Sequence, residues 1–556
     1  SSFQDRSVKF VPYDLRQTML GQAPETMRLF LLAVGLVLLI AVANVASLAL
    51  VRATARTRET SLRTALGASR GRIARLLITE GVILAGVGAA AGLVLANFLL
   101  KGVAVFGLAV PRLSQATIDG RAFGFAAILA LLTGVMVALH PVISLRRGVR
   151  SAIQGGERDV GAKRSTHRAR GILVATQFAL ALPVLAASAL LLNSFMRLGR
   201  VNPGFDPSHL LYLHVTLPRQ SYPDPRAAAT YWNRALAMVS ALPSVEAAGT
   251  NQSLPPEEPP DVNNWVLVDQ ENDPRGGQSV SPWNPVTPSF FETLQVPLLE
   301  GRMFQPTDTG AAPVLIVSRT WVKQFSPSRP AVGRQMQGGG CTDCTPYTIV
   351  GVVDDVKYLG LGGSAQAVYE PTEQYPATDT YLLVRTAGPP GPMIERVRTV
   401  LRSVDAGLAL DDAGTMVDRL SDTMAPERNR TALIGGFGVA ALLLAAVGVF
   451  GMLSYLVATR RREIGVRMAL GAKRAEVLTL ILRRGMGWAA AGAGLGVVAA
   501  LATGTWLRSS LYEISPGDPV TLFAVTGLLL MVALIASWLP ARRAASVAPM
   551  DAIREE

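Results

Sequence analysis

The hydrophobic residues of the chain are concentrated in long stretches that lack charge over about the length needed to cross a bilayer. These stretches are residues 29–51, 81–100, 122–145, 171–196, 431–459, 485–507 and 519–541. A membrane-spanning helix needs about 20 mainly apolar residues, whereas a core helix of a soluble protein seldom runs so far without a charge. The pattern therefore predicts a polytopic α-helical membrane protein with seven membrane-spanning helices.

Residues 197–430 form one large polar block with shorter patterns. Alternating apolar residues predict strands at 210–217, 265–268, 314–317, 347–353 and 381–384. Helical spacing predicts helices at 225–242, 288–294, 319–325 and 392–404. This mixture predicts one α+β domain of two lobes outside the membrane.

A charged-then-apolar segment occurs twice in the chain. Residues 462–472 read Arg-Glu-Ile-Gly-Val-Arg-Met-Ala-Leu-Gly-Ala, and residues 58–68, placed 404 positions earlier, read Arg-Glu-Thr-Ser-Leu-Arg-Thr-Ala-Leu-Gly-Ala. Each copy follows one apolar stretch and precedes another, which indicates an internal duplication of three spans and their loops. Because Gly tolerates the left-handed conformation that ends many helices, each copy is predicted to be a short amphipathic helix.

The net charge of +13 is unevenly distributed. Residues 197–430 hold 19 Lys and Arg against 25 Asp and Glu, so the basic excess belongs to the rest of the chain. Basic residues cluster in 52–75, 146–170, 460–474 and 542–554. The positive-inside rule assigns these clusters to the cytoplasm, and seven alternating spans place all of them on that side. No motif that reads nucleic acid accompanies the charge, so nucleic-acid binding is not expected.

The sequence offers little catalytic chemistry. It contains no Gly-x-x-x-x-Gly-Lys-Ser/Thr phosphate loop, so the chain itself is not expected to bind ATP. The polar block has only His209 and His214 and shows no Ser-His-Asp pattern or metal-ligand cluster. The spans nearly lack the buried acids that ion-coupled transporters use, with Glu80 at a span edge as the sole candidate. We therefore expect no enzyme activity, no cofactor and no metal.

Cys341 and Cys344 are the only cysteines, and they stand in a stretch flanked by Gly and Pro. Zinc would need four ligands and no His lies nearby in the sequence. A redox role would need a helix N-terminus to lower a thiol pKa, whereas this stretch reads as a loop. A structural disulfide at the tip of a hairpin, in an oxidising compartment, is the preferred interpretation.

Together these features resemble the FtsX-like/MacB-type permeases of ATP-binding-cassette (ABC) systems. The resemblance rests on the segment 462–472, on Pro-Ala-Arg-Arg-Ala-Ala at 540–545 and on Pro-Met-Asp-Ala-Ile-Arg at 549–554. In that family a unit has one span, a large periplasmic domain and three further spans. Residues 171–556 match a whole unit and residues 1–170 match the last three spans of another, like the duplicated orphan permeases of acidobacteria. The resemblance implies that a complete protein would have eight spans.

The resemblance implies the following organisation of this chain, with one α+β periplasmic MacB-like core domain. Residues 1–27 end a truncated periplasmic domain, 28–145 form a first FtsX-like permease domain with three spans, 146–170 are a cytoplasmic linker, 171–196 are a span, 197–430 are the MacB-like core domain, 431–541 are a second FtsX-like domain with three spans, and 542–556 are a cytoplasmic tail.

The resemblance also implies that the repeated segments are coupling helices on which a separate ATPase docks. Glu463 and Arg467 lie four residues apart and so share a helix face, which is expected to meet the ATPase; an intrahelical ion pair is the alternative. Met468 and Leu470 are expected to pack against the spans. The coupling residues of the second copy are Glu463, Ile464, Gly465, Arg467, Met468, Leu470, Gly471 and Ala472; those of the first are Glu59, Arg63, Leu66, Gly67 and Ala68. The first copy has Thr60 and Ser61 where the second has Ile464 and Gly465, and a purely structural first helix remains open.

The function implied by the resemblance is that of a permease subunit of an ABC-type export or mechanotransmission system in the bacterial inner membrane. The expected partners are a cytoplasmic ABC ATPase in two copies, a periplasmic adaptor, an outer-membrane channel and membrane lipid. Macrolides, peptides or lipoproteins are the expected substrate classes. The alternative is a non-transporting transmembrane signalling or scaffold protein that regulates a cell-wall hydrolase.

Overall fold

The computed structural model describes residues 23–55, 69–105, 119–135, 159–218, 220–256, 261–270, 278–308, 312–339, 344–459, 466–470 and 473–545. The chain divides into two compact units. The helical unit comprises residues 1–196 and 427–556, and the exterior unit comprises residues 197–426.

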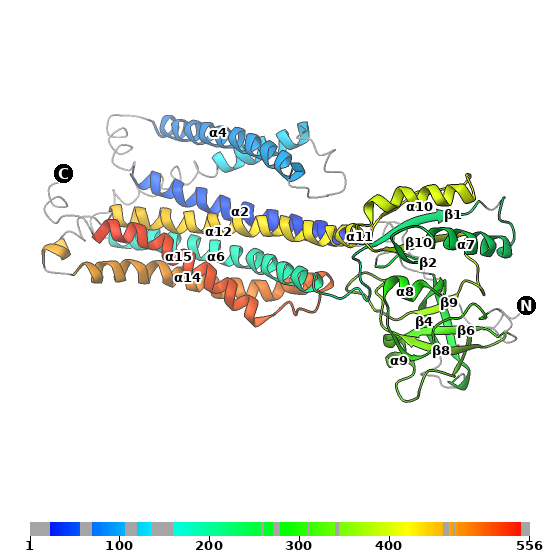
Figure 1. Ribbon diagram of the computed structural model, residues 1–556. Helices are drawn as coiled ribbons and strands as arrows, with labels where there is room; N and C mark the ends of the chain where they lie inside the picture. Colours follow the sequence, from blue (N-terminus) through cyan, green and yellow to red (C-terminus); the bar gives the residue numbers. More distant parts are fainter. Residues whose placement is uncertain are drawn as a thin grey trace, which may run out of the picture. The chain divides into compact units, whose positions relative to one another are not determined.

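The described part of the helical unit consists mainly of long helices (Figure 1). They are α2 (Ala23–Ala55), α4 (Arg70–Val105), an apolar helix at Gly120–Val135, α6 (Asp159–Leu198), α12 (Ala425–Thr459), α14 (Arg474–Gly504), the 3-10 helix η3 (Thr505–Ser510) and α15 (Pro519–Ala545). Within the described residues six helices are long and apolar enough to cross a membrane. The span expected at 122–145 is represented by Gly120–Val135, and its remaining residues lie outside the described part, so the count of seven stays a prediction.

The packed core of this unit is formed around α6. Phe178 and Leu182 of α6 are buried together with residues of α12, α14 and α15 and with Ile40 of α2. α6 and α14 approach closely, because a Cβ at Gly492 would lie 2.3 Å from the carbonyl oxygen of Ala175. Small residues of this kind let helix backbones meet where lipid supplies no hydrophobic drive between helices.

The exterior unit is built on an eleven-stranded sheet. Its strands are β1 (Leu210–Thr216), β2 (Val245–Asn251), β3 (Val262–Leu267), β4 (Gln278–Val286), β5 (Leu298–Gly301), β6 (Val314–Ser318), β7 (Gln335–Gly338), β8 (Tyr347–Val353), β9 (Val368–Pro371), β10 (Asp379–Thr386) and β11 (Ala413–Thr415). The strand order is β11-β1-β10-β2-β4-β3-β7-β8-β6-β9, with β5 beside β8. β4 also pairs with β9, so six of these strands close into a ring.

The helices of the exterior unit are α7 (Pro225–Ser240), α8 (Phe290–Leu294), α9 (Arg319–Phe325), α10 (Gly391–Val404) and α11 (Met416–Thr423). α7 and α10 bury their apolar faces against β1, β10 and β2, and this packing forms one lobe (Figure 1). Trp321 of α9 lies in the core of the closed ring, which forms the other lobe. The expected α+β domain of two lobes is therefore present. α7 begins where the sequence indicates, because Asp224 caps it by accepting from the Arg226 amide and Pro225 occupies its first turn.

Candidate functional sites

The coupling segment of the second half lies between α12 and α14. Residues 466–469 are helical, and the amide of Leu470 donates to the carbonyl oxygen of Val466 at 3.0 Å. Glu463, Ile464, Gly465, Gly471 and Ala472, and all the coupling residues named in the first copy, lie outside the described residues. The coupling role of these residues stays a prediction.

The described part of this segment has two different faces. Met468 packs against the core of the helical unit, as expected, whereas the side chain of Arg467 is exposed. Leu470 was expected to pack against the spans, and this is wrong, because it is 83% exposed. Residues two apart point to different sides of a helix, so Leu470 cannot share the inward face of Met468. The segment therefore exposes the basic side chain of Arg467 together with the apolar side chains of Val466 and Leu470.

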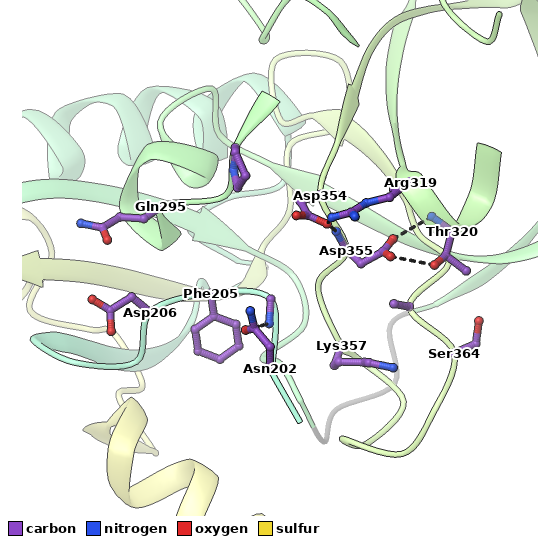
Figure 2. A pocket seen from close by; sticks show the side chains of 13 residues that line it. Asn202, Phe205, Asp206, Gln295, Arg319, Thr320, Asp354, Asp355, Lys357 and Ser364 are labelled. Carbon is purple, nitrogen blue, oxygen red and sulfur yellow. Dashed lines mark hydrogen bonds and ion pairs between the residues drawn. The ribbon is translucent and has the colours of Figure 1, made fainter. Parts of the chain in front are cut away.

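A polar cleft of about 700 Å³ opens in the exterior unit (Figure 2). It lies where the segment that follows α6 meets the first turn of α9 and the connections after β8 and α8. Its lining includes Asn202, Asp206, Gln295, Arg319, Thr320, Asp354, Asp355, Lys357 and Ser364. Most of these polar groups already form hydrogen bonds or ion pairs with other protein atoms. We therefore interpret the cleft as a place where chain segments are held together.

The pairing inside the cleft is dense. Arg319 forms an ion pair with Asp354. Asp355 accepts hydrogen bonds from the amide and the hydroxyl of Thr320, both at 2.7 Å (Figure 2). Lys357 donates to the carbonyl oxygen of Gly363 at 2.7 Å. Within the described residues no group of three His, Cys, Asp or Glu side chains could hold a metal ion.

The segment 202–206, which we call the entering segment, connects α6 to β1 through one wall of the cleft. Gly204 adopts φ +91, and a Cβ there would lie 1.8 Å from the carbonyl oxygen of Asp355, so both the backbone conformation and the space favour glycine. The amide of Lys357 donates to the carbonyl oxygen of Pro203 at 3.0 Å. Phe205 is buried in the core between the lobes. The chain that leaves α6 is therefore anchored in the exterior unit within a few residues.

Arg385 of β10 fastens the same segment from the other side. Its guanidinium donates to three backbone carbonyl oxygens: Asp206 at 2.8 Å, Ser208 at 2.9 Å and Thr293 at 2.7 Å. The side chain is buried, and burial lowers the pKa of Arg385. Hydrogen bonds from Ser208 lower the pKa of the Asp206 carboxyl, which lies 3.7 Å from the guanidinium. Arg385 thus joins the entering segment to the central strand β10 and to the end of α8.

The chain that leads to α12 is attached to the same sheet. β11 pairs with β1, and α11 and α12 follow directly. The hydroxyl of Tyr212 on β1 donates to Asp412 at 3.3 Å, and Arg419 of α11 lies over the Tyr212 ring. Met416, the first residue of α11, is fully buried. The chain from α6 therefore enters the sheet at β1, and the chain that leads to α12 leaves it from β11, the strand paired with β1.

Glu370 is the most deeply buried acid in the described part of the exterior unit, at 3% exposure. It lies on β9, and the indole of Trp283 donates to it at 2.8 Å. Burial raises the pKa of Glu370 to about 7, against the hydrogen bonds from Trp283 and Tyr347, which lower it. The folded exterior unit therefore binds a proton that an unfolded chain would release.

We expect the exterior unit to lose stability as pH rises. Glu370 binds its proton more tightly in the folded state, so its stabilisation is complete below the unfolded pKa of 4.5 and is lost as pH rises through about 7. The loss amounts to at most about 3 kcal/mol. Hydrogen exchange of exterior-unit amides at pH 5 and pH 8, corrected for intrinsic rates, would measure it.

The variant Glu370→Gln should remove most of the pH dependence. Glu373, whose pKa burial also raises, accounts for any remainder. A Gln variant that keeps the full wild-type difference would contradict the assignment.

Cys344 is disulfide-bonded. It lies in the connection between β7 and β8, which pair antiparallel as a hairpin. Cys341 is the only other cysteine of the chain and lies outside the described residues, so the pairing of these two cysteines stays a prediction.

The anchoring residues Gly204 and Arg385 were not singled out by sequence reasoning. A Gly between Pro and Phe shortly after a long apolar stretch is a usable signal for a tight turn at a membrane boundary. Arg385 offers a weaker one: a charged residue directly after the apolar run Tyr381–Val384.

Long apolar helices around one packed core, joined through chain connections to a two-lobed α+β unit, define a polytopic membrane protein with a large domain outside the bilayer. A model of the FtsX-like permease C-terminal region matches residues 31–149 and again 435–549, and a model of the MacB-like periplasmic core domain matches residues 184–400. The chain therefore belongs to the FtsX-like/MacB-type permeases, which makes it a multi-pass inner-membrane protein with a periplasmic domain.

The individual relatives share about a quarter of their aligned residues with this chain. The macrolide export ATP-binding/permease protein MacB of Hahella chejuensis is 26% identical over 49% of this chain and 43% of its own length. The pyoverdine export ATP-binding/permease protein PvdT of Pseudomonas syringae pv. tomato is 26% identical over 47% of this chain and 40% of its own. The chain thus spans less than half the length of these curated relatives. The crystal structure of the periplasmic region of MacB from Actinobacillus actinomycetemcomitans is similar at 11% identity, over 40% of this chain and 94% of that one, with a TM-score of 0.28.

Proposed function

We propose that this chain is the permease subunit of an ABC export or mechanotransmission system, and that it transmits movement generated by a separate cytoplasmic ATPase to its periplasmic domain. The observation that carries the proposal is the coupling segment, repeated after one span and before the next in both halves. Where it is described, this segment is anchored by Met468 and presents Arg467 and Leu470 outward.

The ATPase must be another polypeptide or another part of a longer one. This sequence has no phosphate loop, so it lacks the backbone cradle and the lysine that hold ATP. The relatives named above are ATP-binding/permease proteins, and this chain matches less than half of their length. An ATPase that acts as a dimer would suit a chain with two coupling segments.

The transmission path ends in the exterior unit. α6 leads into the entering segment, which Gly204 and Arg385 fix to the sheet, and α12 is reached from β11. Because both connections attach at or beside β1, a shift of α6 relative to α12 would be applied to one strand. Short, densely bonded connections transmit displacement better than flexible linkers, which would absorb it.

The substrate class proposed is a molecule already in the periplasm, such as a macrolide, a peptide or a lipoprotein. The relatives' names speak of macrolide and pyoverdine export, which supports export as the role. A periplasmic adaptor and an outer-membrane channel would then complete the system.

The proposal is tested by the ATPase activity that co-purifies with the full-length tagged chain in detergent. The double variant Glu463→Ala, Arg467→Ala should lower the stimulation of that activity by about tenfold, which corresponds to about 1.4 kcal/mol of coupling. The matched control is Arg508→Ala, which removes an exposed arginine from η3, the 3-10 helix that follows the C-terminal end of α14. Unchanged stimulation in the double variant, or a chain that retains no ATPase, would contradict the proposal.

A further inference from the structure

The helices α2 and α12 are counterparts in the internal duplication. The coupling segments that follow them start 404 residues apart, at 58 and 462. The two matches to the FtsX-like permease region start at 31 and 435, which gives the same offset. Each residue of α2 therefore has its counterpart on α12 at its own number plus 404.

These two helices lie side by side in the helical unit (Figure 1). The side-chain amide of Asn44 on α2 donates to the carbonyl oxygen of Leu444 on α12 at 2.8 Å. A Cβ at Gly448 would lie 2.4 Å from the Asn44 amide oxygen. Gly448 is the position 404 residues after Asn44, so Asn44 contacts its own counterpart.

The helices α2 and α12 keep the same register nearer to their N-terminal ends. Leu29, Phe30 and Ala33 of α2 share an apolar cluster with Ile434 and Phe437 of α12. Residues 30 and 434, and likewise 33 and 437, differ by the same offset of 404. Two parallel helices meet at equivalent positions along their length only when a twofold axis runs between them, as in a self-complementary dimer interface. The internal repeat thus forms such an interface within one chain.

The contact at the axis is polar and unequal. Gln177 of α6 is fully buried and donates to the Asn44 amide oxygen at 2.9 Å. A Cβ at Gly448 would also lie 2.2 Å from the Gln177 amide oxygen, which has no hydrogen-bond partner among the described residues. Both amides therefore occupy the space that the missing side chain of Gly448 leaves. Polar side chains within a membrane bundle are costly unless they are paired, so this contact specifies one arrangement.

We infer that Asn44, Gln177 and Gly448 form a pairing lock at a pseudo-twofold axis, which commits the second half to the first half of the same chain rather than to a second copy. Two second halves would put glycine against glycine and lose the Asn44 bonds. Two first halves would place a second Asn44 side chain at the position of Gly448. Even a Cβ at that position would lie 2.4 Å from the Asn44 amide oxygen, so a second asparagine does not fit. The inference does not depend on coupling to an ATPase, because it concerns only how the repeated halves pair.

Paired cysteines at counterpart positions test the axis in the full chain. Ile40 and Leu444 are counterparts on the facing sides, where Ile40 is fully buried and the Leu444 carbonyl accepts the Asn44 bond. Leu39 and Leu443 share the offset but are 53% and 62% exposed. A protease site inserted within 151–158 lets the halves be separated after oxidation. Both native cysteines then stay in the C-terminal fragment, so a disulfide between them does not link the two fragments.

The pair Ile40→Cys, Leu444→Cys should link the two fragments of one chain in most molecules, and Leu39→Cys, Leu443→Cys should not. Absence of the first link, equal linking in the control pair, or linking between two chains to give a species of twice the mass would overturn the inference.

The lock itself is tested by adding Gly448→Ala to the linked pair. The methyl group should reduce the yield of the link by about fivefold, because both amides must move away from the axis. Asn44→Ala should restore part of that yield, since it removes one of the two clashing groups. Gly436→Ala on the same helix is the control, because a Cβ there meets no described atom within 4 Å. An unchanged yield in Gly448→Ala would show that the contact does not specify pairing.

Discussion

Replacing Arg385 by methionine should destabilise the exterior unit by about 3–5 kcal/mol, because it removes three hydrogen bonds from a charged group and each such bond contributes about 1.5–3 kcal/mol. The methionine keeps most of the apolar stem but removes three donors, so the carbonyl oxygens of Asp206, Ser208 and Thr293 each lose a bond. The bond to Thr293 is buried, and an unsatisfied buried acceptor costs more than the net value of its bond. The change should therefore loosen the entering segment first and the sheet with it.

Hydrogen exchange of the full-length protein would measure this effect locally. Peptides that cover β1 and β10 should exchange faster in Arg385→Met, whereas peptides from α14 and α15 should keep their wild-type rates. The matched control is Arg402→Met on α10, which removes an exposed arginine from the same unit. Equal exchange in the two variants would show that the Arg385 contacts do not hold the segment.

Gly204→Ala should destabilise the same region by about 2–5 kcal/mol, from backbone strain together with overpacking. Its φ of +91 is unfavourable for alanine, and the added Cβ would lie 1.8 Å from the Asp355 carbonyl oxygen. That distance requires the entering segment or the connection after β8 to move. The variant should therefore open the cleft wall that the two segments share.

Gly333→Ala separates the two causes, because Gly333 has φ +87 but meets no described atom within 4 Å. It should incur only the strain of about 1 kcal/mol that a left-handed alanine carries. The difference between the two variants, measured as loss of protection in β1 and in the connection after β8, reports the steric contact. Equal effects would contradict the close packing of the entering segment on Asp355.

Local patterns predicted several elements well. The strand 347–353 and the helix 319–325 have the predicted bounds in β8 and α9. In contrast, β4 was not predicted, because it contains Pro282 and Pro285 and several polar residues. It exists as a strand because β3 and β9 pair with it, which is tertiary information. Propensity alone cannot supply such a partner.

Some candidate sites could likewise be predicted from the sequence, and others could not. The coupling segment could be found from sequence because it repeats, and repetition is visible in one chain. The Arg385 anchor could not, because its acceptors lie 92 to 179 residues away along the chain. Hydropathy likewise finds apolar spans but does not determine which face of one meets another. The contact between Asn44 and Leu444 joins residues 400 apart, and only the structure shows that counterpart helices meet there.

The central claim, that movement at the coupling segments reaches the periplasmic domain, is tested most directly by an ATP-dependent signal from that domain. A spin label on Val417→Cys, an exposed position of α11 close to the start of α12, would report it in the complex with the co-purified ATPase. The account predicts a change in label mobility when ATP is added, lost in Glu463→Ala, Arg467→Ala and kept in Arg508→Ala. If the protein with an unmutated coupling segment hydrolysed ATP and the mobility of the label at position 417 did not change, the account would be contradicted.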